Sequence, residues 1–146
     1  MGIAYECDER AGITITVWDG NVTPDDWRAL VRGQDADPKW PTGPAFLGVL
    51  TTARGFSTFD ESVVAEMREF YANRPKRLAK IRSATVADRG IETVGTLEQV
   101  VGKLGVRNIV FTDVRTACTW LGVDVEVVEA IVARLRSELR AEREPR

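Results

Sequence analysis

Two short loops of the chain carry residues suited to binding an anion. Arg54 and Arg89 each follow an apolar stretch, and each is followed by a glycine. Within a few residues come Thr58 and Thr96, which predict the starts of two helices. The N-terminus of a helix offers backbone N–H groups and partial positive charge to a phosphate or carboxylate. The candidate anion-binding or ligand-binding residues are therefore Arg54, Ser57, Thr58, Arg89 and Thr96.

The same loops allow two other interpretations. In the first, the glycines only turn the chain and the arginines are solvated. In the second, carboxylates close to these loops serve a small enzyme at the same edge of the sheet. Its candidate residues are Asp60, Glu61, Asp88 and Glu92. A carboxyl group with a raised pKa, lying in a cleft beside a nucleophile, would favour the enzyme over a binding site.

Residues that commonly carry catalysis are scarce. The chain has no histidine, which removes the commonest general base and the commonest metal ligand. Cys7 and Cys118 are far apart in the sequence and fit no CxxC pair, so we expect buried or half-buried thiols. We therefore expect no catalytic residue, no metal and no cofactor, and a protein that is not an enzyme.

The bulk composition is typical of one globular domain. The 146 residues are 44% hydrophobic and 29% charged, which predicts one domain over 1–146 with a frayed tail at about 141–146. A net charge of −2 gives no general attraction to nucleic acid, and we interpret the basic run 74–82 as a solvated connector. No apolar run reaches the roughly 18 residues of a membrane span, and no signal sequence is recognised, which predicts a cytoplasmic protein.

Five strands are predicted from apolar or alternating segments. The first two, at 3–9 and 13–18, are joined by a tight turn and form a hairpin. The run AFLGVL at 45–50 is apolar throughout and predicts a central strand covered on both faces, followed by a loop, TTARGF. The remaining strands are expected at 81–87 and 106–111.

Caps and apolar stripes predict the helices between and after these strands. The expected N-cap residues are Thr23, Thr58, Thr96, Asp113 and Asp124. Thr58 is placed to form a capping box with Glu61. The first helix is expected to end near Gly33, and the last one carries a long apolar stripe that begins at Val125.

The order of elements is therefore ββαβαβαβαα, an α/β arrangement with an N-terminal hairpin followed by alternating helices and mainly parallel strands. In the second strand, apolar Ile13, Ile15 and Val17 alternate with Thr14 and Thr16. A strand with one polar face suits a sheet that carries its helices on one side. We therefore predict a one-sided layering, in which the two threonines meet solvent or a partner.

Four tryptophans offer large apolar surfaces. Trp27 and Trp120 fall on the apolar stripes of helices, so we expect them in the core. Trp18 shares its strand face with the threonines, and Trp40 lies in a proline-rich loop at 35–44. Trp18 and Trp40 are therefore candidates for lining a hydrophobic pocket or a subunit interface.

Three stretches carry a resemblance to a known family: WDGNVTPDDW after the hairpin, the strand AFLGVL, and VRNIVFTDVRTACTWLG in the last third. On these the chain resembles the SpoIIAA-like, or STAS-like, proteins of a bacterial branch. The resemblance implies a superhelix of βα turns and a non-enzymatic regulatory or binding role. In the anti-sigma-factor antagonists of this group, a phosphorylatable serine opens the helix after the central strand. Ser57 and Thr58 lie near that place, but the leading Asp and the following Gly of the motif are missing.

The sequence thus predicts a small module that works by binding. The expected partner is a protein or a small anionic or lipid-like ligand. Besides the small enzyme, one alternative is a homodimer without ligand, whose interface is the threonine-bearing sheet face or the loop around Trp40.

Overall fold

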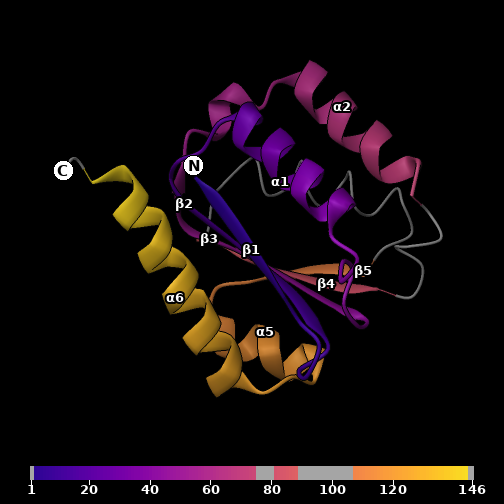
Figure 1. The fold of residues 1–146 in the computed structure, drawn as a ribbon, viewed down its shortest axis with the longest axis vertical. Coiled ribbons are helices and arrows are strands. Elements are labelled where there is room, and N and C mark those ends of the chain that lie inside the picture. Colours follow the sequence, from indigo (N-terminus) through magenta and orange to yellow (C-terminus); the bar gives the residue numbers. More distant parts are fainter. Residues whose placement is uncertain (1, 75–80, 89–106, 145–146) are drawn as a thin grey trace.

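A computed structural model of the protein describes residues 2–74, 81–88 and 107–144. Its strands form one sheet in chain order: β1 (Ile3–Asp8), β2 (Ile13–Asn21), β3 (Ala45–Arg54), β4 (Arg82–Val86) and β5 (Arg107–Phe111) (Figure 1). β1 and β2 pair antiparallel, and the later pairs are parallel. The predicted α/β class, the N-terminal hairpin and the mainly parallel sheet are confirmed.

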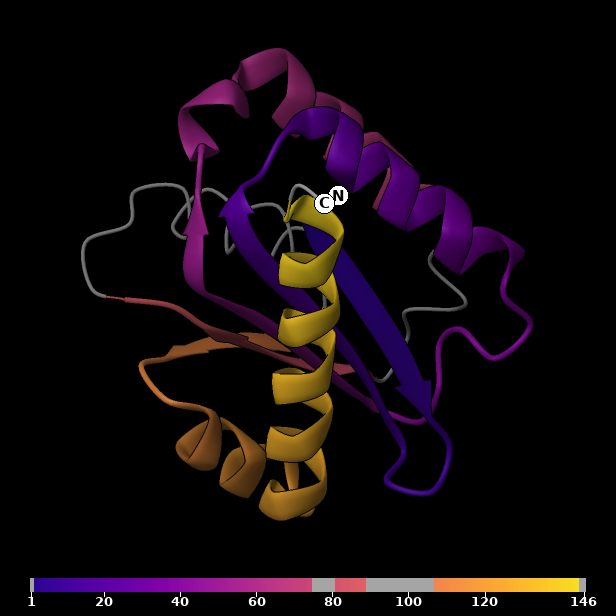
Figure 2. The ribbon, with the colours of Figure 1, turned by 60° about the vertical axis from the view of Figure 1, so that its left-hand side comes forward.

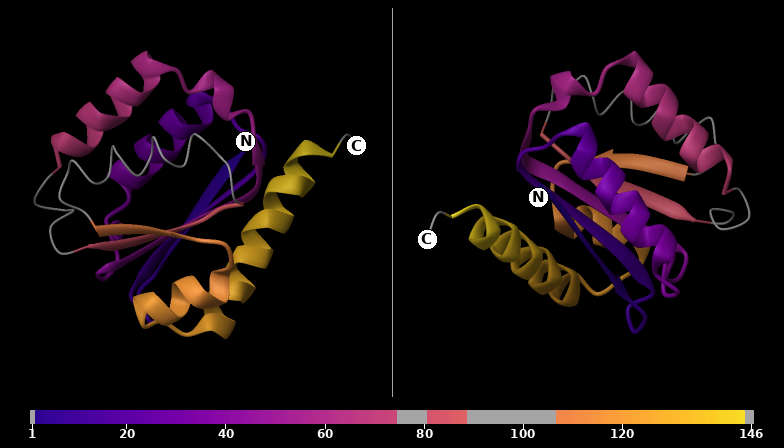
Figure 3. Two further views of the ribbon diagram at one scale, coloured as in Figure 1. Left: turned by 180° about the vertical axis from the view of Figure 1, so that it is seen from behind. Right: turned by 45° about the horizontal axis from the view of Figure 1, so that its top comes forward.

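Helices cover both faces of this sheet. α1 (Pro24–Ala36) and α2 (Glu61–Ala72) lie over one face, whereas α5 (Val114–Leu121) and α6 (Val125–Arg143) lie over the other (Figure 1, Figure 2). Figure 3 shows the sheet between these two layers from two further directions. The predicted one-sided layering is therefore wrong.

That prediction failed because it placed the threonines of β2 in solvent. Thr14 is only 2% exposed, and its hydroxyl oxygen accepts a hydrogen bond from the Thr42 backbone N–H at 3.2 Å. Thr16 is half-buried, and its hydroxyl oxygen accepts from the Trp18 indole N–H at 3.3 Å. A hydroxyl that is paired inside the protein is buried at little cost. Polar residues that alternate with apolar ones along a strand therefore do not require a solvent-exposed sheet face.

The two helical layers enclose separate apolar clusters. On the α5 and α6 side, Ile13, Ile15 and Val17 of β2 pack with the apolar stripe of α6. On the α1 and α2 side, the cluster includes Trp18 and Trp27. β3 contributes to both clusters, which confirms that this strand is central and covered on both faces.

β2 and β3 run further than predicted. The loop expected after residue 50 is wrong for its first four residues, because all four extend β3 and the last three of them pair with the end of β2. The register shifts between Val17 and Asp19, so β3 holds one extra residue there. Leu50 packs on the α2 side, and strict alternation would point the Thr52 side chain toward that same face of the sheet. After the shift, Thr52 instead donates a hydrogen bond to Asp19.

The helix ends agree with the predicted caps in most cases. The confirmed N-caps are Thr23 for α1, Asp113 for α5 and Asp124 for α6. The capping box of Thr58 and Glu61 is wrong: Thr58 ends a short 3-10 helix, η1 (Phe56–Thr58), and Asp60 caps α2 instead. α1 also passes Gly33 and continues to Ala36. The cap predicted at Thr96 lies outside the described residues.

Candidate functional site

The anion site predicted from the loops is described only in part. Arg54 ends β3, Ser57 and Thr58 follow in η1, and all three residues are exposed. The Thr58 hydroxyl donates to the Gly55 carbonyl oxygen at 2.7 Å. Arg89 and Thr96 lie outside the described residues. The convergence of the two loops therefore stays a prediction.

Trp18 and Trp40 both lie in the interior. Trp18 is 7% exposed, and its ring centroid lies 6.2 Å from that of Phe56 and 6.1 Å from that of Phe59. Trp40 is 3% exposed and packs on Phe46, with ring centroids 6.2 Å apart. Within the described residues, therefore, both indoles serve the packing of the chain itself.

Other predicted residues are placed as follows. Trp27 is buried, as expected, whereas Trp120 is only half-buried. The thiol predictions are confirmed, because Cys118 is buried and Cys7 is half-buried. In the basic run 74–82, Arg74 forms an ion pair with a carboxylate of α1, and residues 75–80 lie outside the described residues.

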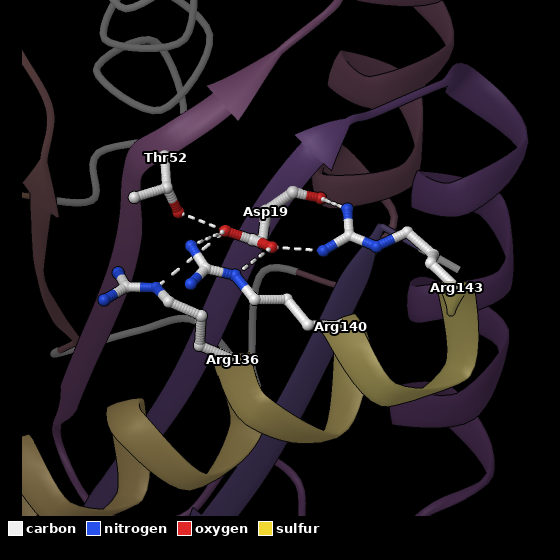
Figure 4. Close-up of polar contacts among 5 residues, drawn as sticks. All are labelled: Asp19, Thr52, Arg136, Arg140 and Arg143. Atoms are coloured by element: carbon white, nitrogen blue, oxygen red, sulfur yellow. Dashed lines mark hydrogen bonds and ion pairs between the residues drawn. The ribbon is translucent and has the colours of Figure 1, made fainter. Parts of the chain in front are cut away.

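The sequence interpretation missed a polar site where β2 ends beneath α6 (Figure 4). Asp19 is only 2% exposed. Arg140 donates from Nε to Asp19 Oδ2 at 3.1 Å and from Nη2 to Oδ1 at 3.2 Å. Arg143 donates from Nη1 to the Asp19 backbone oxygen at 2.8 Å and from Nη2 to Oδ2, and the Thr52 hydroxyl donates to Oδ1. Both oxygens of this buried carboxylate are therefore engaged.

The helix and the turn beside it fix these arginines in place. Residues 136, 140 and 143 are spaced by four and three positions, which places them on one face of α6. Gly20 follows Asp19 with a φ of +73°, and a Cβ atom there would lie 1.8 Å from Arg143 Nη1. The Arg143 guanidinium thus occupies space that only a glycine leaves open.

Charge pairing dominates the electrostatics of Asp19. Burial alone raises the pKa of this carboxyl, but hydrogen bonds from Arg140, Thr52 and Arg143 outweigh burial and hold the pKa well below its usual range. The hydrogen bond to Asp19 in turn raises the pKa of Arg140. The group is therefore a fixed ion cluster at any ordinary pH.

Arg136 is the exception in this cluster. Its Nε lies 3.9 Å from Asp19 Oδ1, which is too far for a hydrogen bond. That nitrogen is buried and has no hydrogen-bond partner within the described part of the chain. The Arg136 side chain is 25% exposed, and its terminal nitrogens point away from Asp19 (Figure 4).

Arg136 stands between two hollows. The first, called here the edge cleft, has a volume of about 360 Å³ and lies among the carboxyl ends of β3, β4 and β5, the start of α5 and one side of α6. Its polar lining residues are Thr51, Thr112, Asp113, Glu129 and Arg136. The second, the α6 groove, measures about 460 Å³ and includes Arg136, Arg140 and Glu144. Ligands of open α/β sheets commonly bind beyond the carboxyl ends of the strands, where the edge cleft lies.

The carboxylates considered for an enzyme do not gather in either hollow. Asp60, Glu61 and Asp88 are exposed, and Glu92 lies outside the described residues. A hydrogen bond from a backbone N–H group lowers the pKa of Asp60, which favours its charged form. The pKa is likewise lowered at Asp19, Asp37, Glu66 and Asp113, whereas the enzyme interpretation requires a raised one. No three metal-ligating side chains cluster in the described ranges.

Comparison with models of known protein families and with curated proteins found no match for this sequence. None of the described helices has the length and apolar content that a membrane crossing requires.

Two signals in the sequence point to the missed site. Asp19 continues the alternation of Ile13, Ile15 and Val17, so an acid is placed on the strand face that an apolar helix covers. On α6, arginines stand directly beside the apolar stripe, where long side chains reach over the sheet. Each signal is weak alone, and together they indicate a buried ion pair only once the sheet packing has placed β2 beneath α6.

Proposed function

We propose that the protein is a binding or regulatory module of the STAS-like type, without catalysis of its own. It recognises an anionic group carried by a partner protein or by a small anionic or lipid-like ligand. The contact surface is the arginine face, defined as Arg136, Arg140 and Arg143 of α6. This proposal rests above all on one observation, that three guanidinium groups share a single buried carboxylate.

The charge of this cluster is unbalanced. Three arginines face Asp19, and Glu144 adds only one further carboxylate to the α6 groove. The Arg140 side chain is 56% exposed and the Arg143 side chain 34% exposed, so both remain within reach of solvent and of a ligand. A guanidinium is a planar fork of donors that matches carboxylate and phosphate oxygens. An anionic group therefore complements this surface.

The ion cluster also prepares the arginines for binding. A flexible arginine loses rotamer freedom when it binds a ligand, and this loss weakens binding. Asp19 already orders Arg140 and Arg143 through paired hydrogen bonds, so less entropy is lost when a ligand arrives. Arg54, exposed at the end of the neighbouring strand, extends positive charge along the same end of the sheet.

Titration with simple anions tests this proposal. Inorganic phosphate and pyrophosphate represent small anions, and vesicles that contain an anionic lipid represent a lipid surface. Calorimetry and co-sedimentation at physiological salt are expected to detect binding to at least one of them. The double variant Arg140→Gln/Arg143→Gln is expected to bind at least about tenfold more weakly, which corresponds to the loss of one charge-assisted contact.

A charge-matched control separates the arginine face from net charge. Arg115 and Arg134 are exposed arginines of the same helical layer, with side chains 70% and 47% exposed. The control Arg115→Gln/Arg134→Gln is expected to keep wild-type affinity. An equal loss in both double variants, or no binding by the wild-type protein, would refute the proposal.

A further inference from the structure

We infer that the edge cleft binds a compact amphoteric molecule, with its anionic group on Arg136 and a cationic group on Glu129. This inference rests on the proposed function and narrows the ligand to the class of small aminocarboxylates. It depends on four features of the cleft: one arginine with unused donors, one carboxylate with a weak partner, an apolar floor between them, and a small volume.

Arg136 supplies the anion contact. Its neighbours on the arginine face are held by Asp19, but Arg136 makes only a 3.9 Å contact with that carboxylate. Its buried Nε has no hydrogen-bond partner among the described residues. Its terminal nitrogens point away from Asp19 (Figure 4), and the side chain is 25% exposed, so these nitrogens can donate to a ligand oxygen. The geometry of the folded chain alone therefore leaves Arg136 with donors to offer.

Glu129 supplies the second contact. Of the two carboxylates in the cleft, Asp113 is already engaged, since it accepts the Thr116 backbone N–H at 2.7 Å and the Thr116 hydroxyl at 2.9 Å. Glu129 has only a long contact of 3.8 Å with Arg115, and its side chain is 51% exposed. It is therefore the carboxylate that can accept an ammonium group.

The placement of these two residues favours a short ligand. Glu129 and Arg136 are two turns apart on α6, so both lie on one side of that helix, and both line the edge cleft. Val132 and Ala133 lie between the two residues, and Val49 and Val86 of the sheet complete an apolar floor. A short chain of methylene groups suits that floor.

The same lining disfavours other anions. A dianion such as phosphate would bring two negative charges beside Glu129 and Asp113, and like charges oppose binding. A volume of about 360 Å³ also suits a small molecule more than a lipid tail or a nucleotide. The cleft thus differs in selectivity from the outer part of the arginine face, although Arg136 belongs to both.

Three matched probes test the inference on the full chain. Butanoate carries the anionic group, butylammonium carries the cationic group, and 4-aminobutanoate carries both on one short methylene chain. Calorimetry is expected to show that 4-aminobutanoate binds at least about tenfold more tightly than either single-charge probe. Arg136→Gln and Glu129→Gln are each expected to remove that tenfold advantage, whereas Arg134→Gln keeps it.

The outcomes separate this inference from the proposed function. If phosphate binds in an Arg140-dependent manner but 4-aminobutanoate has no advantage over butanoate, the inference is wrong and the proposed function stands. If 4-aminobutanoate binds more tightly than the single-charge probes and this advantage survives Arg136→Gln, a different site binds the amphoteric ligand and the inference is again wrong. A urea unfolding curve for each variant verifies that the protein is folded in these titrations.

Discussion

The substitution Asp19→Asn tests the central ion cluster. It keeps the shape of the side chain but removes the charge, and it turns one acceptor oxygen into a donor that faces Arg140 and Arg143. Removing one partner of a buried ion pair costs about 3–5 kcal/mol. The two arginines keep part of their exposure and regain water, and asparagine keeps one acceptor. We therefore expect the free energy of unfolding to fall by about 2–3 kcal/mol.

Urea unfolding followed by circular dichroism measures this loss. The matched control is Asp25→Asn, because Asp25 also pairs with an arginine, at 2.7 Å, but its side chain is 89% exposed. Exposed ion pairs add little to stability, so the control is expected to match the wild-type protein within the error of the assay. A loss for Asp19→Asn that is no larger than that of the control would refute the buried, fully engaged carboxylate described above.

The same substitution predicts a pH dependence. The pKa of Asp19 is well below its usual range in the folded protein and close to 3.9 when the chain is unfolded. As the pH falls, the Asp19 carboxyl is therefore protonated at a higher pH in the unfolded chain than in the folded protein. The stabilisation by Asp19 is complete above about pH 5 and declines as the pH falls further. The difference in stability between wild-type protein and Asp19→Asn is expected to shrink between about pH 5 and pH 2. A constant difference over that range would contradict the assignment.

Three further predictions use the same unfolding assay or thiol chemistry. Gly20→Ala is expected to lower the free energy of unfolding by at least about 1 kcal/mol more than Gly12→Ala does. Both glycines have a positive φ, but only Gly20 lies against a guanidinium. Asp60→Ala is expected to destabilise the protein more than Thr58→Ala, since Asp60 caps α2; equal effects would contradict the assigned cap. Burial raises the pKa of Cys118 to about 11, so a thiol reagent at pH 8 is expected to label it only after unfolding, and rapid labelling of the native protein would contradict its buried position.

The parts of the fold that the sequence predicts are those encoded by neighbouring residues. The apolar run 45–50 identifies a central strand because its burial on both faces requires apolar side chains throughout. Thr23, Asp113 and Asp124 identify helix starts because a cap is a contact between residues two or three positions apart. Such contacts can be read without knowledge of the rest of the chain.

The candidate site could not be predicted in the same way. Asp19 and Arg140 are 121 positions apart, and which strand lies beneath α6 is decided by the packing of the whole sheet. The extra residue in β3 that turns Thr52 toward Asp19 leaves no signal in a polar stretch such as TTAR. The prediction of a one-sided layering failed for a related reason. In the sequence Thr14 resembles a solvent-facing residue, because the hydrogen bond that it accepts comes from Thr42 in a distant loop.

Stability alone does not explain why three arginines meet at Asp19. One carboxylate has two oxygens, and hydrogen bonds from Thr52, Arg140 and Arg143 already engage both of them. Burying a further guanidinium nitrogen without a partner is unfavourable, and buried charge is in general a poor source of stability. The fold thus accounts for Arg140 and Arg143 as the links between helix and strand. Arg136 has no comparable structural role among the described residues, and binding an anionic group at the edge of the sheet is the role that its donors fit.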